Sequence, residues 1–369
     1  MIVGVPRERK TREKRVAITP DGVGEITRRG HTVLIETCAG DGSSYSDAEF
    51  LSAGAKIVPT LADVWSADLV VKVKEPAPEE YDLMREGQIV FDYLHLASMP
   101  ELTKIMLDKK ITGIAYELVQ FPDGRLPLLE PMSEVAGKLA VLNGANFLLS
   151  QNGGRGELLG GTIGVPPVKV VVIGGGVAGR AAVQMAVGLG ASVTVLDRRY
   201  ERLEYLYRDY KSLIRTVHSS RGTLERELED ASIVIGAVLI PGAAAPKIIT
   251  KEMMKLVNRG GVFVDISIDQ GGCAETSVLT SLDSPVKDID GVLHYGVPNM
   301  PAQTPRTSTK ALTAATLPYI VDLASGGLSA LDKDPLLRGA LNVHRGLLTN
   351  EAVSEATGFP YHSPERALG

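Results

Sequence analysis

The stretch VIGGGVAGRAA, residues 172–182, contains four glycines and almost no reactive side chain. It follows the β-branched run KVVVI and precedes a helical pattern that ends near Gly188 and Gly190. Gly174, Gly176 and Gly179 have G-x-G-x-x-G spacing. Between a strand and a helix, such glycines allow a tight turn, close approach of the main chain to a pyrophosphate, and close packing of the helix on the strand. The stretch therefore predicts a dinucleotide-binding βαβ unit.

Asp197 supports this interpretation, because glycines of this spacing can also serve packing alone. It ends the next predicted strand, SVTVLD, where a carboxylate accepts hydrogen bonds from the adenosine ribose hydroxyls. The same charge repels the 2′-phosphate of NADP, so we expect NAD as the cofactor. Arg198 and Arg199 follow directly and can accommodate that phosphate, which leaves some NADP use open.

Strand-like runs alternate with helical patterns on both sides of the glycine turn, which predicts an α/β fold. We expect two doubly wound, Rossmann-like domains with mostly parallel sheets covered on both faces. The first is a discontinuous substrate domain of residues 1–130 and 305–369, and residues 131–304 form the NAD-binding domain. A helix over residues 132–150 joins them, and the part after Pro305 is expected to be helical. The predicted strands are IVGVP, HTVLIE, AKIVP, DLVVKVK, QIVFDYL and ITGIAYE, then VKVVVIG, SVTVLD, LIRTVH, SIVIGAV, GVFVDIS and GVLHYGV.

Composition excludes several classes of protein. With 39 Lys+Arg against 44 Asp+Glu, the chain lacks the basic surface that nucleic acid requires. Cys38 and Cys273 are too few for a disulfide framework or a cysteine zinc site, which favours the cytoplasm. A charged N-terminus and the lack of a long apolar run predict no membrane association. The 6 histidines are dispersed, so no metal site is expected.

Four polar residues follow predicted strands, where ligands of open α/β sheets bind. Arg15 and Lys74 offer a bidentate fork and a point charge for a carboxylate, His95 can carry protons near neutral pH, and Asp269 supplies the opposite charge. Taken singly, Arg15 and Lys74 could be solvated charges and His95 a structural histidine. Asp265 is expected to be buried and structural. Together the four suit a small amino or keto acid.

With these residues in place, the chain resembles the alanine dehydrogenase family over nearly its whole length. The motifs that carry the resemblance are VPRERK, RVAITP, VKVKEP, YLHLA, PMSEVAG, GGGVAG, GAVLIPGAAAPK, DISIDQGGC and VPNMPAQTPRTST. The resemblance implies reversible oxidative deamination of L-alanine to pyruvate and ammonia with NAD, in a cytoplasmic homohexamer.

The resemblance also implies roles for individual residues. Arg15 and Lys74 bind the substrate, and His95 and Asp269 perform acid–base chemistry. The implied cofactor-binding residues are Ser133, Gly174, Gly176, Val177, Ala178, Gly179, Asp197, Arg202, Ser219, Val238, Leu239, Ile266, Ser267, Ile268, Asp269, Val297, Pro298, Asn299 and Met300.

Three other functions fit parts of the pattern. The nucleotide-binding part of a proton-translocating transhydrogenase has a similar fold but passes hydride between dinucleotides. A saccharopine-forming or lysine-reducing relative would take a larger amino acid. A non-catalytic NAD-sensing regulator would keep the glycine turn and Asp197 but has no need of Arg15, Lys74, His95 and Asp269.

Overall fold

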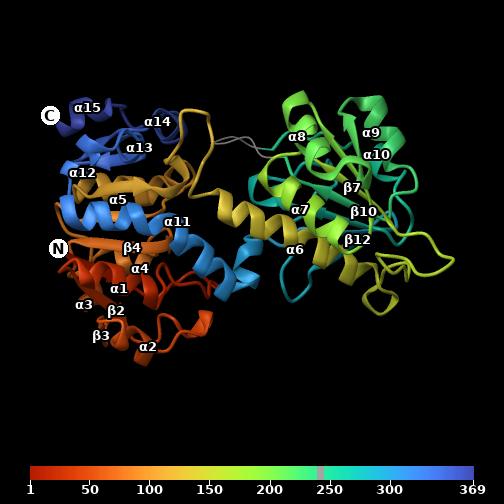
Figure 1. The fold of residues 1–369 in the computed structure, drawn as a ribbon. Helices are drawn as coiled ribbons and strands as arrows, with labels where there is room; N and C mark the ends of the chain where they lie inside the picture. Colours follow the sequence, from red (N-terminus) through yellow and green to blue (C-terminus); the bar gives the residue numbers. More distant parts are fainter. Residues whose placement is uncertain (239–244) are drawn as a thin grey trace. The chain divides into compact units, whose positions relative to one another are not determined.

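Each half of the strand–helix alternation forms its own sheet in the computed structural model, which describes residues 1–238 and 245–369 (Figure 1). One unit comprises Met1–Met132 with Ala302–Gly369, and the other comprises Ser133–Pro301. Both ends of the chain therefore belong to the same unit.

The first unit is built on an eight-stranded sheet in the order β15-β14-β6-β5-β4-β1-β2-β3. Strands β1 to β6 are parallel, and β14 is antiparallel to both β6 and β15. The strands are β1 Ile2–Val5, β2 Thr32–Glu36, β3 Lys56–Val58, β4 Leu69–Lys74, β5 Ile89–Tyr93, β6 Thr112–Ala115, β14 Leu341–His344 and β15 Leu347–Leu348.

The second unit is built on a seven-stranded sheet in the order β12-β13-β11-β10-β7-β8-β9. All pairs are parallel except β12 with β13. The strands are β7 Lys169–Ile173, β8 Ser192–Asp197, β9 Ile214–His218, β10 Ile233–Gly236, β11 Val262–Asp265, β12 Val286–Ile289 and β13 Val292–Tyr295.

The parallel part of each sheet has the doubly wound order 3-2-1-4-5-6 when its strands are numbered along the chain, which confirms the predicted fold class. The strand order reverses between β1 and β4 in the first sheet and between β7 and β10 in the second. Ligands of open α/β sheets bind outside the carboxyl ends of the strands at this point of reversal. The topology therefore marks one candidate ligand site in each unit.

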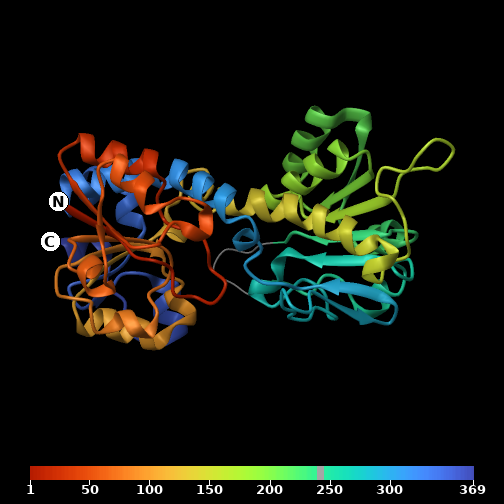
Figure 2. The same cartoon turned by 90° about the horizontal axis from the view of Figure 1, so that it is seen from below.

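Side chains of the central strands alternate between the two faces of each sheet. In the second unit, Val170 and Val172 belong to one buried cluster, whereas Val171 and Ile173 belong to the other. Both faces are covered by helices, so these strands are apolar throughout, as buried parallel strands are. Figure 2 shows the yellow and green helices α6, α7 and α8 beside the strands of the second sheet.

Helices pack on both faces of the first sheet as well. Helices α1 and α11 contribute Val23, Ile26 and Leu312 to one cluster, and α5 contributes Leu102 and Met106 to the other. The helices of this unit are α1 Pro20–Arg28, α2 Asp47–Ser52, α3 Leu61–Trp65, α4 Pro78–Tyr81, α5 Pro100–Asp108, α11 Pro305–Gly326, α12 Ser329–Lys333, α13 Pro335–Gly339, α14 Glu351–Thr357 and α15 Pro364–Leu368. The remaining helices are α6 Glu130–Leu148, α7 Val177–Gly188, α8 Tyr200–Tyr210, α9 Arg221–Leu228 and α10 Lys251–Met254.

Side chains cap the N-termini of two helices of the first unit. Thr19 caps α1 by accepting the Gly22 N–H at 3.3 Å, and Ser46 with Glu49 forms a capping box on α2. The predicted joining helix is α6, which runs along the chain from the first unit into the second.

The expectation that the chain is helical after Pro305 is wrong in part. Strands β14 and β15 lie between helices α13 and α14, and β14 adds to the free edge of β6. The short edge strand β12 was likewise not predicted. Strands β12 and β15 are edge strands, and short edge strands pair through main-chain groups, so their apolar pattern is weak. Among the described residues, no helix combines the length and apolar character needed to cross a bilayer.

Candidate active site

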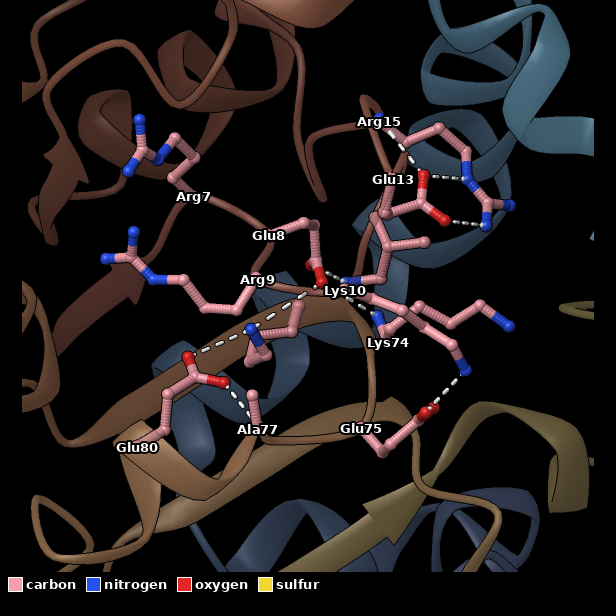
Figure 3. A network of polar contacts seen from close by, with 12 residues as sticks. Arg7, Glu8, Arg9, Lys10, Glu13, Arg15, Lys74, Glu75, Ala77 and Glu80 are labelled. Atoms are coloured by element: carbon pink, nitrogen blue, oxygen red, sulfur yellow. Dashed lines mark hydrogen bonds and ion pairs between the residues drawn. The ribbon is translucent and has the colours of Figure 1, made fainter. Parts of the chain in front are cut away.

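Arg15 lies in the loop between β1 and α1 and is buried, with 2% of its surface exposed. Its Nε and Nη2 donate to the two carboxylate oxygens of Glu13 at 2.7 and 2.5 Å, and its Nη1 lies 3.1 Å from Met132 Sδ. Burial alone would lower the pKa of Arg15, but the hydrogen bonds and charge of Glu13 raise it. The guanidinium is therefore a fixed cation with a set orientation (Figure 3).

Lys74 ends β4, the strand next to β1 at the point where the strand order reverses. Burial lowers the pKa of its ammonium, and the nearby cations of Arg15 and Lys10 lower it further. Two cations thus converge at the carboxyl ends of β1 and β4, where an anionic ligand would relieve their repulsion.

His95 lies just beyond β5, and its Nδ1 is 3.3 Å from Glu75 Oε2. The other oxygen of Glu75 accepts a hydrogen bond from Lys10 Nζ at 2.7 Å. Burial on its own would raise the pKa of Glu75, but His95, Lys10 and Lys74 together hold it well below its ordinary value. An ionised carboxylate beside Nδ1 favours a proton on that nitrogen, which directs Nε2 to accept or donate a proton elsewhere.

The main chain of His95 has φ 49°, a left-handed conformation that is uncommon outside glycine. Glu117 Oε1 accepts its N–H at 2.7 Å, and its ring stacks on Tyr93 with centroids 5.9 Å apart. Tyr93 is held in turn by the Leu128 carbonyl, which accepts its hydroxyl at 2.5 Å. These contacts hold a strained residue in place, as is common at functional sites.

In the second unit, the glycine turn follows β7 and opens α7. A Cβ on Gly174 would lie 2.4 Å from the Ala237 carbonyl oxygen, and one on Gly179 would lie 1.7 Å from the Gly174 carbonyl oxygen. Gly174 also has φ 103°. A Cβ on Gly176, by contrast, would have as its nearest neighbour an atom of the Arg202 side chain, 3.6 Å away. Two of the glycines thus serve packing, and the third leaves the main chain at the start of α7 open to a phosphate.

Asp197 ends β8 and is 6% exposed. Its carboxylate accepts the N–H groups of Gly175 at 2.7 Å and Arg199 at 2.8 Å, and forms an ion pair with Arg202 at 3.2 Å. The acid therefore joins the glycine turn to the end of β8, and it brings Arg202 to the same place.

The segments after β10, β11 and β13 are tied to one another by hydrogen bonds. Ser267 Oγ donates to the Val238 carbonyl oxygen at 2.7 Å, and both Asp269 oxygens accept the Asn299 N–H, at 3.2 and 3.1 Å. Asp265 is buried, as expected, and burial raises its pKa. Asp269 is exposed in the same segment.

The predicted cofactor-binding residues of the described chain lie at the carboxyl ends of strands of the second sheet or at the start of a helix. Leu239 is outside the described residues. Ser133 lies in α6, Val177 and Ala178 begin α7, Ser219 follows β9, Ile266, Ser267 and Ile268 follow β11, and Val297, Pro298, Asn299 and Met300 follow β13. Arg15, Lys74 and His95 belong to the first unit, whereas Asp269 belongs to the second, so the joint action of His95 and Asp269 stays a prediction.

Sequence reasoning missed the carboxylates that hold two of the candidate residues of the first unit, Arg15 and His95. These are Glu13, Glu75 and Glu117, and each accepts hydrogen bonds from Arg15 or His95. Two of these carboxylates lie close in sequence to a candidate residue, which is the signal that could have identified them. Glu75 directly follows Lys74, and Glu13 precedes Arg15 by two positions. Nothing in the sequence points from Glu117 to His95.

Comparison with known proteins decides the family. Residues 4–136 match the family described as "Alanine dehydrogenase/PNT, N-terminal domain", and residues 140–351 match "Alanine dehydrogenase/PNT, C-terminal domain". The chain belongs to the alanine dehydrogenase/PNT family. The chain is similar to "Alanine dehydrogenase" of Mycobacterium tuberculosis, with 50% identity over 370 residues that cover 100% of each chain.

Solved structures agree with this assignment to the alanine dehydrogenase/PNT family. A structure named "L-alanine dehydrogenase" is 48% identical, has a TM-score of 0.95, and covers 97% of this chain and 99% of its own. A "transhydrogenase from Sinorhizobium meliloti" is 26% identical with a TM-score of 0.82, and covers 95% of this chain and 100% of its own. The recognition of the alanine dehydrogenase family from sequence is confirmed.

Proposed function

We infer that the chain is an oxidoreductase that acts on the CH–NH₂ group of L-alanine with NAD. The reaction converts L-alanine, NAD⁺ and water to pyruvate, ammonium, NADH and a proton, and it is reversible. Similarity over the full length to proteins named alanine dehydrogenase supports this function. The transhydrogenase alternative has less support, since its structural relative shares 26% identity against 48%.

One observation in the first unit carries the choice of a small acid as the substrate. The Arg15 guanidinium and the Lys74 ammonium lie within electrostatic reach of each other, and the pKa of Lys74 is lowered by burial and by Arg15. The carboxylate of alanine or pyruvate would balance these two charges, and the guanidinium fork matches it bidentately. We assign substrate binding to Arg15 and Lys74.

The second unit fits NAD. Gly174, Gly176 and Gly179 with the start of α7 would hold the pyrophosphate, and Asp197 would receive the ribose hydroxyls. When bound, NAD accepts the hydride that leaves Cα of alanine. The position of Asp197 supports a preference for NAD over NADP.

His95 and Asp269 are proposed to move and balance protons. With Nδ1 against Glu75, the His95 Nε2 is the atom that takes a proton from the water added to the imine and returns it when ammonia leaves. Glu75 stabilises the imidazolium while it holds that proton. Asp269 would orient the water or the departing ammonia and stabilise positive charge on the substrate nitrogen.

A set of three assays tests the function against its alternatives. Nicotinamide absorbance is followed with alanine and NAD, with lysine plus 2-oxoglutarate and NADH, and with NADH plus a second dinucleotide as acceptor. We expect turnover in the assay with alanine and NAD and no turnover in the other two. Turnover only between dinucleotides would support the transhydrogenase alternative, and binding of NAD without turnover would support a regulator.

The domain roles and the assembly are part of the same proposal. Residues 1–130 and 305–369 form the substrate domain, and residues 131–304 form the NAD-binding domain. We propose a homohexamer in the cytoplasm. Exposed apolar side chains at Leu158, Ile163 and Val165, with relative exposures of 65%, 102% and 57%, support self-association because a partner copy would cover them. Light scattering on the purified chain tests the number of copies.

A further inference from the structure

The main chain at the end of β4 departs from the regular ladder just where Lys74 stands. Val71 is paired with Phe91 and Lys74 with Tyr93, so three steps along β4 are matched by two along β5. On its other side, β4 is paired with β1 only as far as Val70. An irregularity of this kind re-aims the side chains that follow it. Because the pairing with β1 ends at Val70, the N–H groups that follow on β4 have no partner in β1.

Glu8, in the loop after β1, supplies the missing acceptor. One of its carboxylate oxygens accepts the Val73 N–H at 2.6 Å, and the other accepts the Lys74 N–H at 3.4 Å. The Glu8 side chain is 2% exposed. Its carboxylate therefore supplies the acceptors for β4 where the pairing with β1 has ended.

A buried lysine holds this carboxylate. Lys72 Nζ lies 3.6 Å from Glu8 Oε2 and 3.0 Å from Glu80 Oε1, and its side chain is 1% exposed. Figure 3 shows Glu8 beside Lys74, with Glu80 to the lower left. A buried carboxylate in this position is costly unless it is paired and hydrogen-bonded, and here it is both.

We propose that Glu8 is a positioning residue for substrate binding, because its carboxylate fixes the main chain at Val73 and Lys74 and thereby aims the Lys74 ammonium at the substrate carboxylate. This inference rests on the proposed function, since it needs Lys74 to bind pyruvate. Glu8 itself does not touch the substrate.

The ionisation of Glu8 gives the proposal a signature in pH. Burial raises the pKa of Glu8 to about 7, against the opposing effect of Lys72. Protonation removes one acceptor and weakens the hold on the main chain, so wild-type binding should lose the contribution of Glu8 as the pH falls through this value. The charged and titratable groups that face Glu8 are Lys72 on β4, Glu13 and Arg15 in the loop before α1, Glu80 on α4, Asp92 on β5, and Tyr116 after β6.

The test is steady-state reductive amination by the full chain with Glu8→Gln, compared with wild type. The Michaelis constant for pyruvate is expected to rise about tenfold with kcat changed by less than about twofold, as for a loss of substrate binding. The ratio of the two Michaelis constants should fall towards one between about pH 8 and about pH 6, because all other titrations are shared by both proteins. An unchanged Michaelis constant, or a ratio that does not vary with pH, would overturn the proposal.

A matched control separates positioning from stability. Glu36 is also a buried carboxylate that accepts a main-chain N–H of the same loop, from Arg7 at 2.9 Å, and pairs with Arg9. Glu36→Gln should lower stability and leave the Michaelis constant for pyruvate unchanged, and an equal rise in this control would count against Glu8.

A second variant covers the case in which Glu8→Gln does not fold. Glu8→Asp keeps the charge beside Lys72 but shortens the reach, so the Michaelis constant should again rise, and an unchanged value would reject the inference. A wild-type chain without turnover of pyruvate would overturn both proposals. An active wild type with an unaffected Glu8 variant would overturn only this one.

Discussion

Arg15→Lys tests the proposed substrate site most directly, because it keeps the charge and removes the fork. Arg15 meets the two Glu13 oxygens with two parallel contacts of 2.7 and 2.5 Å, and its side chain is 2% exposed. A lysine ammonium is a point charge that cannot satisfy Glu13 and also match a substrate carboxylate bidentately. A hydrogen bond to a charged group is worth ~1.5–3 kcal/mol. Loss of one such contact to pyruvate corresponds to a rise in its Michaelis constant of about 10- to 150-fold.

The assay is oxidation of NADH at varied pyruvate and saturating ammonium, with NADH affinity measured separately by fluorescence. Unfolding by denaturant should show a loss of ~1.5–3 kcal/mol, because Glu13 stays buried with one contact fewer. Arg28→Lys serves as the control, since the Arg28 side chain is 67% exposed and pairs with Glu25 on the surface. A pyruvate Michaelis constant within about twofold of wild type would refute the role given to Arg15.

Three further predictions concern the other candidate residues. His95→Ala should lower turnover by about 10²-fold or more with NADH affinity retained, and full turnover would remove His95 from the mechanism. In the folded chain, His95 and Lys10 hold the pKa of Glu75 below its ordinary value of 4.5. Ionised Glu75 therefore stabilises the fold at pH values above 4.5, and this contribution is lost as the pH falls below 4.5. The difference in unfolding free energy between wild type and Glu75→Gln should therefore shrink on acidification, and a constant difference would contradict the pairing. Asp197→Ala should weaken NADH binding by about tenfold and improve NADPH binding, and calorimetric titration giving an unchanged preference would exclude Asp197 as the selecting residue.

Much of the fold follows from local patterns in the sequence. Apolar runs of strand length alternate with capped helices, and burial on both faces of a parallel sheet requires both features. The turn at Gly174–Gly176–Gly179 was predictable because glycines of this spacing between a strand and a helix are typical of a dinucleotide-binding turn, and at Gly174 and Gly179 a Cβ would clash with main-chain oxygens. Thr19 and Ser46 were recognisable caps because capping depends on neighbours three positions away.

The candidate site was predictable only in part. Arg15, Lys74 and His95 could be selected because residues after parallel strands gather at one edge of a sheet. Their partners could not be selected. His95 meets Glu75 and Glu117 from positions 20 and 22 residues away, and these pairings depend on how β4, β5 and β6 lie side by side.

The sequence alone predicted two doubly wound sheets, a glycine turn of dinucleotide-binding spacing in a βαβ unit that ends at Asp197, and polar residues suited to a small acid. These properties depend on the spacing of residues within short segments, which can be read directly from the sequence. Only the tertiary structure decided that β14 closes the edge beside β6, that Glu13 and Glu75 orient the candidate residues, and that Glu8 completes the irregular end of β4. The last contact joins residues 65 positions apart, and no local pattern encodes which distant carboxylate will meet a given main-chain N–H.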